Sequence, residues 1–389
     1  MPKLSEYRLI FRSGFHLDTR GVNPEESATY VPSDTLFAAL VDAHRRAGGD
    51  PDAFVTSFPQ RQEGEPPAPP PFRLTSAFPF AGKIRFFPMP VPFHVWFNGE
   101  TLRRRLKDLR RIRFVSEGLF RRMVQGERLD EWLFPPEGEE KGQHKGIALQ
   151  HGALWLSSEE VAGLPDTMRL HPKKKNSRPH RALRYTRVWA LHRVPRVTVD
   201  RFSSASEIFH VGRVAFAPGC GLWFGVEWHA PDQKVDGEGI AYRDAFHRAL
   251  SLLADDGLGG ERSAGYGAFT WERGGDLSLP TPSPGEALYL LSRYHPRRSE
   301  LPEALTGEGG GYSLISVAGW LRSPDGVAQR RRRLWMVAEG SIVRAVGAGP
   351  WGDVVDVRPT YENPAGDLPH PVWRYGLALG TGVKEVDRG

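Results

Sequence analysis

Apolar residues recur along the first part of the chain with the periods of strands and helices. Residues 4–11 alternate apolar and polar positions, which predicts a strand ending at residues 13–14. After a turn-rich passage, the run YVPSDTLFAALVDAHRR predicts a helix with its apolar positions at 36, 37, 40 and 41 on one face and Ser33 as the N-cap. This part of the chain therefore begins with a strand, a loop and a helix.

The same periods continue towards residue 275. FRLTSAFPFAGKIRFFPMPVPF predicts a hairpin that turns at residues 81–82, and RVWALHRVPRVTVDR and VGRVAFAPGCGLWFGVEW predict strands joined by a polar stretch at 202–210. IAYRDAFHRALSLLADDG predicts a helix that stops at Gly257, and after a glycine-rich loop GAFTWE predicts a last strand. The resulting βαββαβ order is that of an α+β, ferredoxin-like (RRM-like) domain, with one face of its sheet available to RNA.

The length of 389 residues favours two domains, or one domain with a large insertion. We expect the first at 1–275, with a basic insertion at about 99–187 whose short apolar runs argue against a core of its own. The proline-rich run at 63–71 predicts a semi-rigid linker or loop. Beyond GGDLSLPTPSPGE, strand signals in ALYLLSRYH, YSLISVAGWL, RRLWMVAEGSIVRAV and VWRYGLAL predict a second, smaller β-rich ferredoxin-like domain at 276–389.

Composition adds a preference for a polyanionic partner. The net charge of +6 is modest, but cations gather in three clusters. One cluster alone fits a solvated face as well as it fits nucleic acid, whereas three together favour nucleic acid, because neutralised phosphates release counterions. The clusters are Arg103, Arg104, Arg105, Lys107, Arg110, Arg111 and Arg113; Lys173, Lys174, Lys175, Arg178, Arg181, Arg184 and Arg187; and Arg330, Arg331, Arg332 and Arg333.

Several classes of protein lose support from the sequence. Cys220 is the single cysteine, which excludes an internal disulfide framework and a cysteine zinc site, so no metal or cofactor is expected. No window approaches eighteen apolar residues and no signal pattern is evident, so we expect a cytoplasmic protein without a membrane partner. The loop GGERSAGYGAF lacks the Lys-Ser/Thr of a phosphate-binding Walker loop and the third glycine of a dinucleotide fingerprint.

That loop still offers the chemistry of RNA recognition. Its backbone amides can approach a phosphodiester, Arg262 can bind phosphate with two donors, Ser263 carries a hydroxyl, and Tyr266 can stack on a base. A tight structural turn with Tyr266 packed inward is the alternative.

The loop GLGGERSAGYGAF resembles the signature loop of the RAMP superfamily of CRISPR RNA-binding proteins. Together with YVPSDTLFAAL, LTSAFPFAGKIRFFPMPVP and RVTVDRFSSASEIFHVGRVAF, it is similar to the subunit of the type III-A (Csm) effector that binds the 5′ tag of the guide RNA (crRNA). The resemblance implies a role in antiviral defence, with crRNA, a large polymerase-like subunit and a repeated backbone subunit as partners. The basic insertion lies outside the resemblance.

The resemblance also assigns candidate RNA-binding residues. At the start of the first helix, Asp34 fits poorly beside phosphate, so accepting from a base or capping the helix are open alternatives. Residues 199–209, with Arg201, resemble a thumb hairpin that wedges between guide bases; Arg201 binds phosphate or pairs with Asp200. His16 lies where relatives place an RNA-contacting or catalytic residue, although an ordinary loop histidine is the plainer interpretation. The full set is His16, Ser33, Asp34, Thr35, Arg201, Gly259, Gly260, Arg262, Ser263, Gly265 and Tyr266.

These observations favour a non-catalytic RNA-binding subunit. The main alternative is a guide-RNA processing endoribonuclease of the same superfamily, with His16 and Tyr266 as general base and acid. The cyclic-nucleotide-making large subunit is disfavoured, because Gly274-Gly275-Asp276 is followed by Leu277 and no His-Asp dipeptide occurs.

Overall fold

The computed structural model describes residues 3–18, 25–60, 68–134, 145–169, 183–199, 206–307, 310–321, 329–360 and 368–386. The α-helices of this part are α1 (Ser33–Arg46), α2 (Pro51–Thr56), α3 (Gly99–Leu109), α4 (Glu117–Val124), α5 (Asp130–Leu133) and α7 (Tyr242–Asp256). Short 3-10 helices are η1 (Phe93–Trp96), η2 (Gln150–Gly152), η3 (Ser158–Gly163), η4 (Arg262–Ala264), η5 (Arg298–Glu300) and η6 (Glu303–Leu305). No helix among the described residues is long and apolar enough to cross a membrane.

One large mixed sheet organises the N-terminal and middle parts of the chain. Its path runs β11-β1-β10-β3-β4-β5-β7-β6, with β12 paired to β1 and β2 paired to β10. Neighbours along β11-β1-β10-β3 are antiparallel, whereas β5 and β7 are parallel. The strands are β1 (Lys3–Phe11), β2 (Phe72–Leu74), β3 (Phe78–Ala81), β4 (Ile84–Pro88), β5 (Phe114–Ser116), β6 (Gly146–Leu149), β7 (Leu154–Ser157), β10 (Cys220–Trp228), β11 (Phe269–Arg273) and β12 (Leu277–Ser278).

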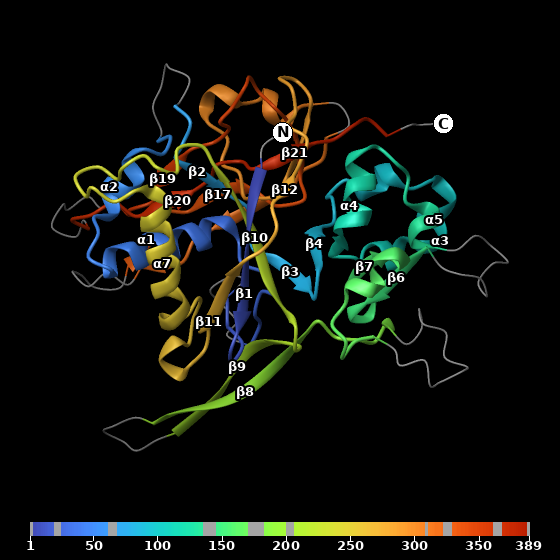
Figure 1. Cartoon of the computed structure of the whole chain (residues 1–389), viewed down its shortest axis with the longest axis horizontal. Coiled ribbons are helices and arrows are strands. Elements are labelled where there is room, and N and C mark those ends of the chain that lie inside the picture. Colours follow the sequence, from blue (N-terminus) through green and yellow to red (C-terminus); the bar gives the residue numbers. More distant parts are fainter. Residues whose placement is uncertain are drawn as a thin grey trace.

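Most N-terminal elements lie where the hydrophobic pattern predicts them. The predicted first strand, the β3–β4 hairpin, the α7 helix ending at Gly257 and the last strand β11 are all confirmed. Gly257 has a φ of +88°, which suits a glycine at a helix end. Helices α1 and α7 pack together beside the sheet, at the left of Figure 1. The α1 side chain of Phe37 is fully buried, with its ring 4.9 Å from that of Tyr375.

The prediction for the insertion is wrong in one respect: residues 99–187 contribute to the core. Strands β5, β6 and β7 extend the main sheet beyond β4, and α4 lies beside them on the right of Figure 1. Phe87 of β4 and Phe120 of α4 stack with ring centroids 4.1 Å apart. The apolar runs in this segment are short because each strand has only three or four residues, yet every residue of these strands is buried.

The C-terminal part consists of small antiparallel sheets. Strands β18, β13 and β21 form one sheet, and β14–β17, β15–β16 and β19–β20 pair separately. Tyr289, Leu291 and Tyr375 share a continuous apolar core with the main sheet. The four predicted strand regions are confirmed, while β16, β19 and β21 lie outside them. The bounds are β13 (Ala287–Leu290), β14 (Leu314–Val317), β15 (Trp320–Leu321), β16 (Gln329–Arg330), β17 (Leu334–Val337), β18 (Ile342–Arg344), β19 (Val354–Asp356), β20 (Trp373–Tyr375) and β21 (Gly380–Gly382).

A long hairpin stands apart from these layers. Strands β8 (Trp189–Val199) and β9 (Ser206–Phe216) pair with each other and project from the lower edge of the molecule in Figure 1. The predicted polar connection at 202–210 is wrong for residues 206–210, which form the start of β9 and pair one to one with residues 195–199 of β8. Arg201 lies outside the described residues.

Candidate nucleic-acid interface

The glycine-rich loop connects the end of α7 to β11 and is closed by backbone hydrogen bonds. The amide of Leu258 donates to the carbonyl of Gly267 at 3.0 Å, and the amide of Gly267 donates to Gly14 at 2.9 Å. Gly265 and Gly267 have φ values of +80° and +85°. Such left-handed positions favour glycine, so the glycines first of all shape a compact loop against the end of β1.

His16 fastens this loop to the projecting hairpin. The amide of Gly260 donates to the His16 carbonyl at 2.8 Å, and His16 Nδ1 lies 2.7 Å from the carbonyl oxygen of Gly212 in β9. Gly259 has a φ of +100°, and a Cβ there would lie 2.2 Å from the His16 carbonyl oxygen. The side chain of His16 is buried, so its role in this structure is to hold the loop and the base of the hairpin together.

Tyr266 is surrounded by arginines from the hairpin. Its side chain is only 6% exposed, with the guanidinium carbons of Arg196 and Arg213 at 5.4 and 5.9 Å from the ring centroid. The Nε atoms of both arginines are buried without a hydrogen-bond partner, and neither forms an ion pair within the described residues. Two cations are thus held by an aromatic ring rather than by carboxylates, which leaves their charge available to an anion.

The exposed rim of the loop adds further donors. Arg262 and Ser263 belong to η4 and are both exposed, and Arg262 has no carboxylate partner in the described part of the chain. The Ser13 hydroxyl donates to the Gly265 carbonyl at 2.5 Å and fixes the far side of the loop. We call Arg196, Arg213, Arg262, Ser263 and Tyr266 the loop–hairpin surface.

The outer half of the hairpin presents apolar side chains to solvent. Val197 is 58% exposed and pairs directly with Ile208, which is 67% exposed; Val199 on the same face is 59% exposed. Cross-strand partners share one face of a hairpin, so these residues form an apolar strip on the face opposite Arg196 and Arg213. A projecting apolar strip of this kind can insert between stacked rings or pack on a partner.

The start of α1 is occupied by contacts inside the protein. Ser33 is not the N-cap: Pro32 is, and the Ser33 hydroxyl accepts from the amide of Arg293 at 2.9 Å. Asp34 is fully buried, and its two carboxylate oxygens bind Arg293 at 2.8 Å and Arg374 at 3.1 Å. Only Thr35 is partly exposed. The tertiary contacts to the C-terminal part override the local capping signal.

This buried charge cluster also perturbs its arginines. Burial alone would lower the pKa of Arg293, but Asp34 and Glu339 outweigh it and hold that pKa above its ordinary value. For Arg374, burial wins over the attraction of Asp34 and the pKa lies below its ordinary value. Asp34 therefore links the first helix to the C-terminal part, a role that the sequence pattern gives no sign of.

The structure brings His16, Gly259, Gly260, Arg262, Ser263, Gly265 and Tyr266 together and places Ser33, Asp34 and Thr35 in a different region, at the start of α1. Sequence reasoning missed Arg196 and Arg213. The only available signal was strand alternation, which sets Arg196 and Arg213 on the same face once the β8–β9 register is known. No cluster of metal-ligating side chains is present among the described residues, and burial raises the pKa of the Cys220 thiol to about 12.

Comparisons with known proteins agree with this architecture. Residues 283–383 match the family model of the CRISPR Csm4 C-terminal domain. The CRISPR system Cms protein Csm4 of Thermococcus onnurineus (strain NA1) is 27% identical over 191 residues, which are 49% of this chain and 54% of that protein. The chain thus matches about half the length of this curated relative.

Solved structures share the fold. A chain of the Csm3-Csm4 subcomplex of the type III-A CRISPR-Cas interference complex aligns with a TM-score of 0.58 and 16% identity, covering 98% of this chain and 99% of that one. A chain of the Csm1-Csm4 cassette in complex with cA4 aligns with a TM-score of 0.52 and 20% identity, with all of both chains covered. Residues 283–383 thus match a Csm4 C-terminal domain model, about half of the chain is similar to a curated Csm4 protein, and the whole chain shares its fold with chains of the Csm3-Csm4 and Csm1-Csm4 structures.

Proposed function

We propose that this chain is a non-catalytic RNA-binding subunit of a type III-A CRISPR interference complex. In this proposal it anchors the 5′ tag of the crRNA at the loop–hairpin surface and serves antiviral defence. The observation that carries the proposal is the arrangement around Tyr266, where Arg196 and Arg213 carry charge without a carboxylate partner among the described residues. Phosphodiesters are the anions that such grouped guanidiniums favour, because Arg offers several donors in a fixed plane.

The proposed RNA path begins at the loop and continues along the hairpin. Arg262, Ser263 and the hairpin arginines would hold backbone phosphates, while the apolar strip of Val197, Val199 and Ile208 would separate neighbouring bases. Asp34 has no part in this contact, because it is buried and already bound to two arginines. Its proposed role is to fix α1 against the C-terminal part.

The fold supports a finer division that we also propose. The order β11-β1-β10-β3, with α1 and α7 packed together, is the strand order of a ferredoxin-like domain, here residues 1–275 with the insertion at 99–187. Residues 276–389 would be the second, β-rich ferredoxin-like domain. The common core of Tyr289 and Leu291 with the main sheet suggests that the two domains move as one.

The proposed partners follow from the relatives. Csm4 chains occur with Csm3 in one solved subcomplex and with Csm1 in another. We propose that this chain likewise bridges a repeated backbone subunit to the large polymerase-like subunit. The tag held at the loop–hairpin surface would then fix where base pairing to a target begins.

The alternative is a guide-RNA processing endoribonuclease that uses His16 and Tyr266. These side chains are only 7% and 6% exposed, so a scissile ribose would have poor access to either. General acid–base catalysis requires the catalytic group within hydrogen-bond reach of the reacting proton. The geometry therefore favours binding over cleavage.

One experiment separates these functions. The purified chain is mixed with one crRNA, with and without its 5′ tag, in magnesium buffer, and the RNA is then run on a denaturing gel. Tag-dependent binding with intact RNA is the expected result. Cleaved RNA would favour the endoribonuclease, and tag-independent binding would assign the affinity to the basic clusters instead of the loop–hairpin surface.

A further inference from the structure

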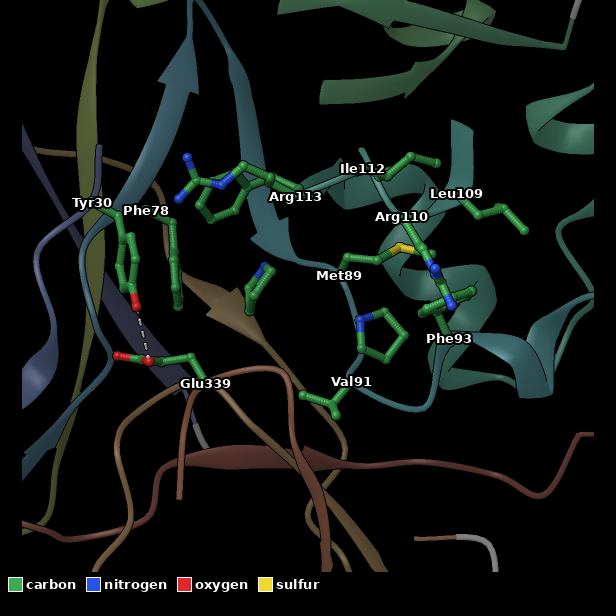
Figure 2. Close-up of a pocket in the computed structure, with 13 residues that line it drawn as sticks. Tyr30, Phe78, Met89, Val91, Phe93, Leu109, Arg110, Ile112, Arg113 and Glu339 are labelled. Atoms are coloured by element: carbon green, nitrogen blue, oxygen red, sulfur yellow. Dashed lines mark hydrogen bonds between the residues drawn. The ribbon is translucent and has the colours of Figure 1, made fainter. Parts of the chain in front are cut away.

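A pocket of about 340 Å³ lies between β4, the end of α3 and the C-terminal part of the chain (Figure 2). Its lining includes Tyr30, Met89, Phe93, Arg110, Arg113 and Glu339. Backbone hydrogen bonds fix the wall, since the amide of Met89 donates to Arg113 and that of Val91 donates to Gly340, both at 2.8 Å. The volume is at the lower end of the range for small-molecule sites. None of these residues belongs to the loop–hairpin surface.

One side of the pocket is aromatic. The rings of Tyr30 and Phe78 stack with centroids 6.2 Å apart and planes inclined by 20°, and they stand side by side in Figure 2. Phe114 meets Tyr30 edge-on at 6.1 Å. These contacts hold the partly exposed Tyr30 ring in a fixed orientation, so it offers a rigid flat surface to a planar ligand.

Glu339 places a carboxylate beside this aromatic wall. Its Oε1 accepts from the Ser76 hydroxyl and lies 3.7 Å from Arg293 Nε. Its Oε2 accepts only from the Tyr30 hydroxyl, at a long 3.3 Å, among the described residues. A carboxylate oxygen can accept more than one hydrogen bond, so Oε2 retains capacity for a donor from a ligand.

Cations border the same pocket. Arg110 and Arg113 are exposed, and neither has a carboxylate partner in the described part of the chain. Arg113 lies 5.7 Å from the Phe114 ring centroid, so an aromatic face rather than an acid supports it. A flat wall, one spare acceptor and two unneutralised cations are thus combined in one pocket.

We propose that this pocket binds a nucleotide whose base carries an amino group. The base would lie against Tyr30 with its amino group donating to Glu339, and the phosphate would bind Arg110 and Arg113. Adenine, cytosine and guanine offer such a donor, whereas uracil has no amino group and its ring N3–H lies between two carbonyl oxygens that the carboxylate repels. An apolar side chain of a protein partner would leave Glu339 and both arginines unmatched, which makes it the poorer occupant.

The test is binding of the full chain to adenosine, cytidine, guanosine and uridine 5′-monophosphates by calorimetry. We expect the three amino-bearing nucleotides to bind roughly tenfold more tightly than the uridine nucleotide, as one good base contact provides. Arg110→Ala should weaken all of them about tenfold, because it removes a charge-assisted contact. The matched control is Arg103→Ala. Arg103 is an exposed arginine on α3 that does not line the pocket and has no ion-pair partner in the part of the chain that the structure describes.

Glu339→Gln keeps the side-chain size and should reduce the difference in binding affinity between the adenosine and uridine nucleotides. Because Glu339 also accepts a hydrogen bond from Ser76, the thermal unfolding of the Glu339→Gln variant is measured in parallel. Arg110→Ala tests the pocket without altering the contact between Glu339 and Ser76. Oligoadenylate that binds much more tightly than the mononucleotide would identify the occupant as a residue of an RNA strand; equal affinities would identify a free nucleotide.

The proposal is overturned if neither mononucleotides nor oligoadenylate bind, if Arg110→Ala binds like the wild type, or if Arg103→Ala loses as much affinity. Arg262→Ala distinguishes nucleotide binding in the pocket from tag binding at the loop–hairpin surface, because it should leave the affinity for mononucleotides unchanged. The pocket proposal and the tag-binding proposal can therefore be refuted independently of each other.

Discussion

Removing the cations of the loop–hairpin surface should weaken RNA binding and its salt dependence together. Arg262 is exposed and has no carboxylate partner among the described residues, so Arg262→Ala should change the free energy of unfolding by less than about 0.5 kcal/mol. The lost contact to phosphate should cost about 1.5–3 kcal/mol of binding free energy. That range corresponds to a loss of affinity between about tenfold and 150-fold.

The salt dependence gives an independent magnitude. Each phosphate contact to single-stranded nucleic acid contributes about 0.7 to the slope of log affinity against log salt concentration. Replacing Arg196, Arg213 and Arg262 together with alanine should therefore lower that slope by about 2 if each binds one phosphate. Hairpin arginines also pack on Tyr266, so the triple variant requires a check of folding by circular dichroism.

The assay is fluorescence anisotropy of labelled crRNA over a salt series. Lys83→Ala is the matched control, because Lys83 is an exposed cation in the turn between β3 and β4 and has no ion-pair partner within the described ranges. The control should retain both affinity and slope. A triple variant with the wild-type slope would refute the phosphate contacts at this surface, even if its affinity fell.

Three further predictions concern stability and reactivity. Asp34→Ala should destabilise the chain by about 3–5 kcal/mol in urea unfolding, because it leaves the buried Arg374 without its carboxylate partner; a change below about 1 kcal/mol would contradict a structural role. Gly259→Ala should reduce both stability and crRNA affinity, since its Cβ would meet a backbone carbonyl at 2.2 Å, whereas Gly265→Ala faces open space and should cost only about 1–2 kcal/mol. Equal effects of the two alanines would argue against the loop geometry. The Cys220 thiol, 3% exposed and with its pKa raised to about 12, should resist alkylation at neutral pH until denaturant is added, and rapid labelling of the native chain would show that β10 opens readily.

The sequence predicts the elements that local patterns encode. The alternation of β1, the apolar face of α7 and the stop at Gly257 are local properties, and each lies where it was predicted. The insertion was misjudged because its strands are too short to produce a long apolar run, although pairing with β4 buries all their residues. Burial of that kind depends on neighbours that are distant in sequence.

The site shows the same division between local and distant information. The glycine loop can be recognised in the sequence because backbone positions in the left-handed region favour glycine whatever surrounds the loop. The pairing of Tyr266 with Arg196 and Arg213 depends on the docking of the hairpin base through His16, which no local pattern encodes. In the sequence, Ser33 and Asp34 resemble an ordinary helix start. Their actual partners are Arg293 and Arg374 of the C-terminal part, which contact them only in the folded structure.

Photocrosslinking would test the central proposal most directly. A crRNA carrying photoreactive uridines at single positions of its 5′ tag is bound to the chain, irradiated and digested, and the attached peptides are identified by mass spectrometry. The proposed anchoring predicts crosslinks to the glycine-rich loop around Tyr266 and to the β8–β9 hairpin. Crosslinks confined to the basic segment 99–187, with none at the loop or hairpin, would contradict it.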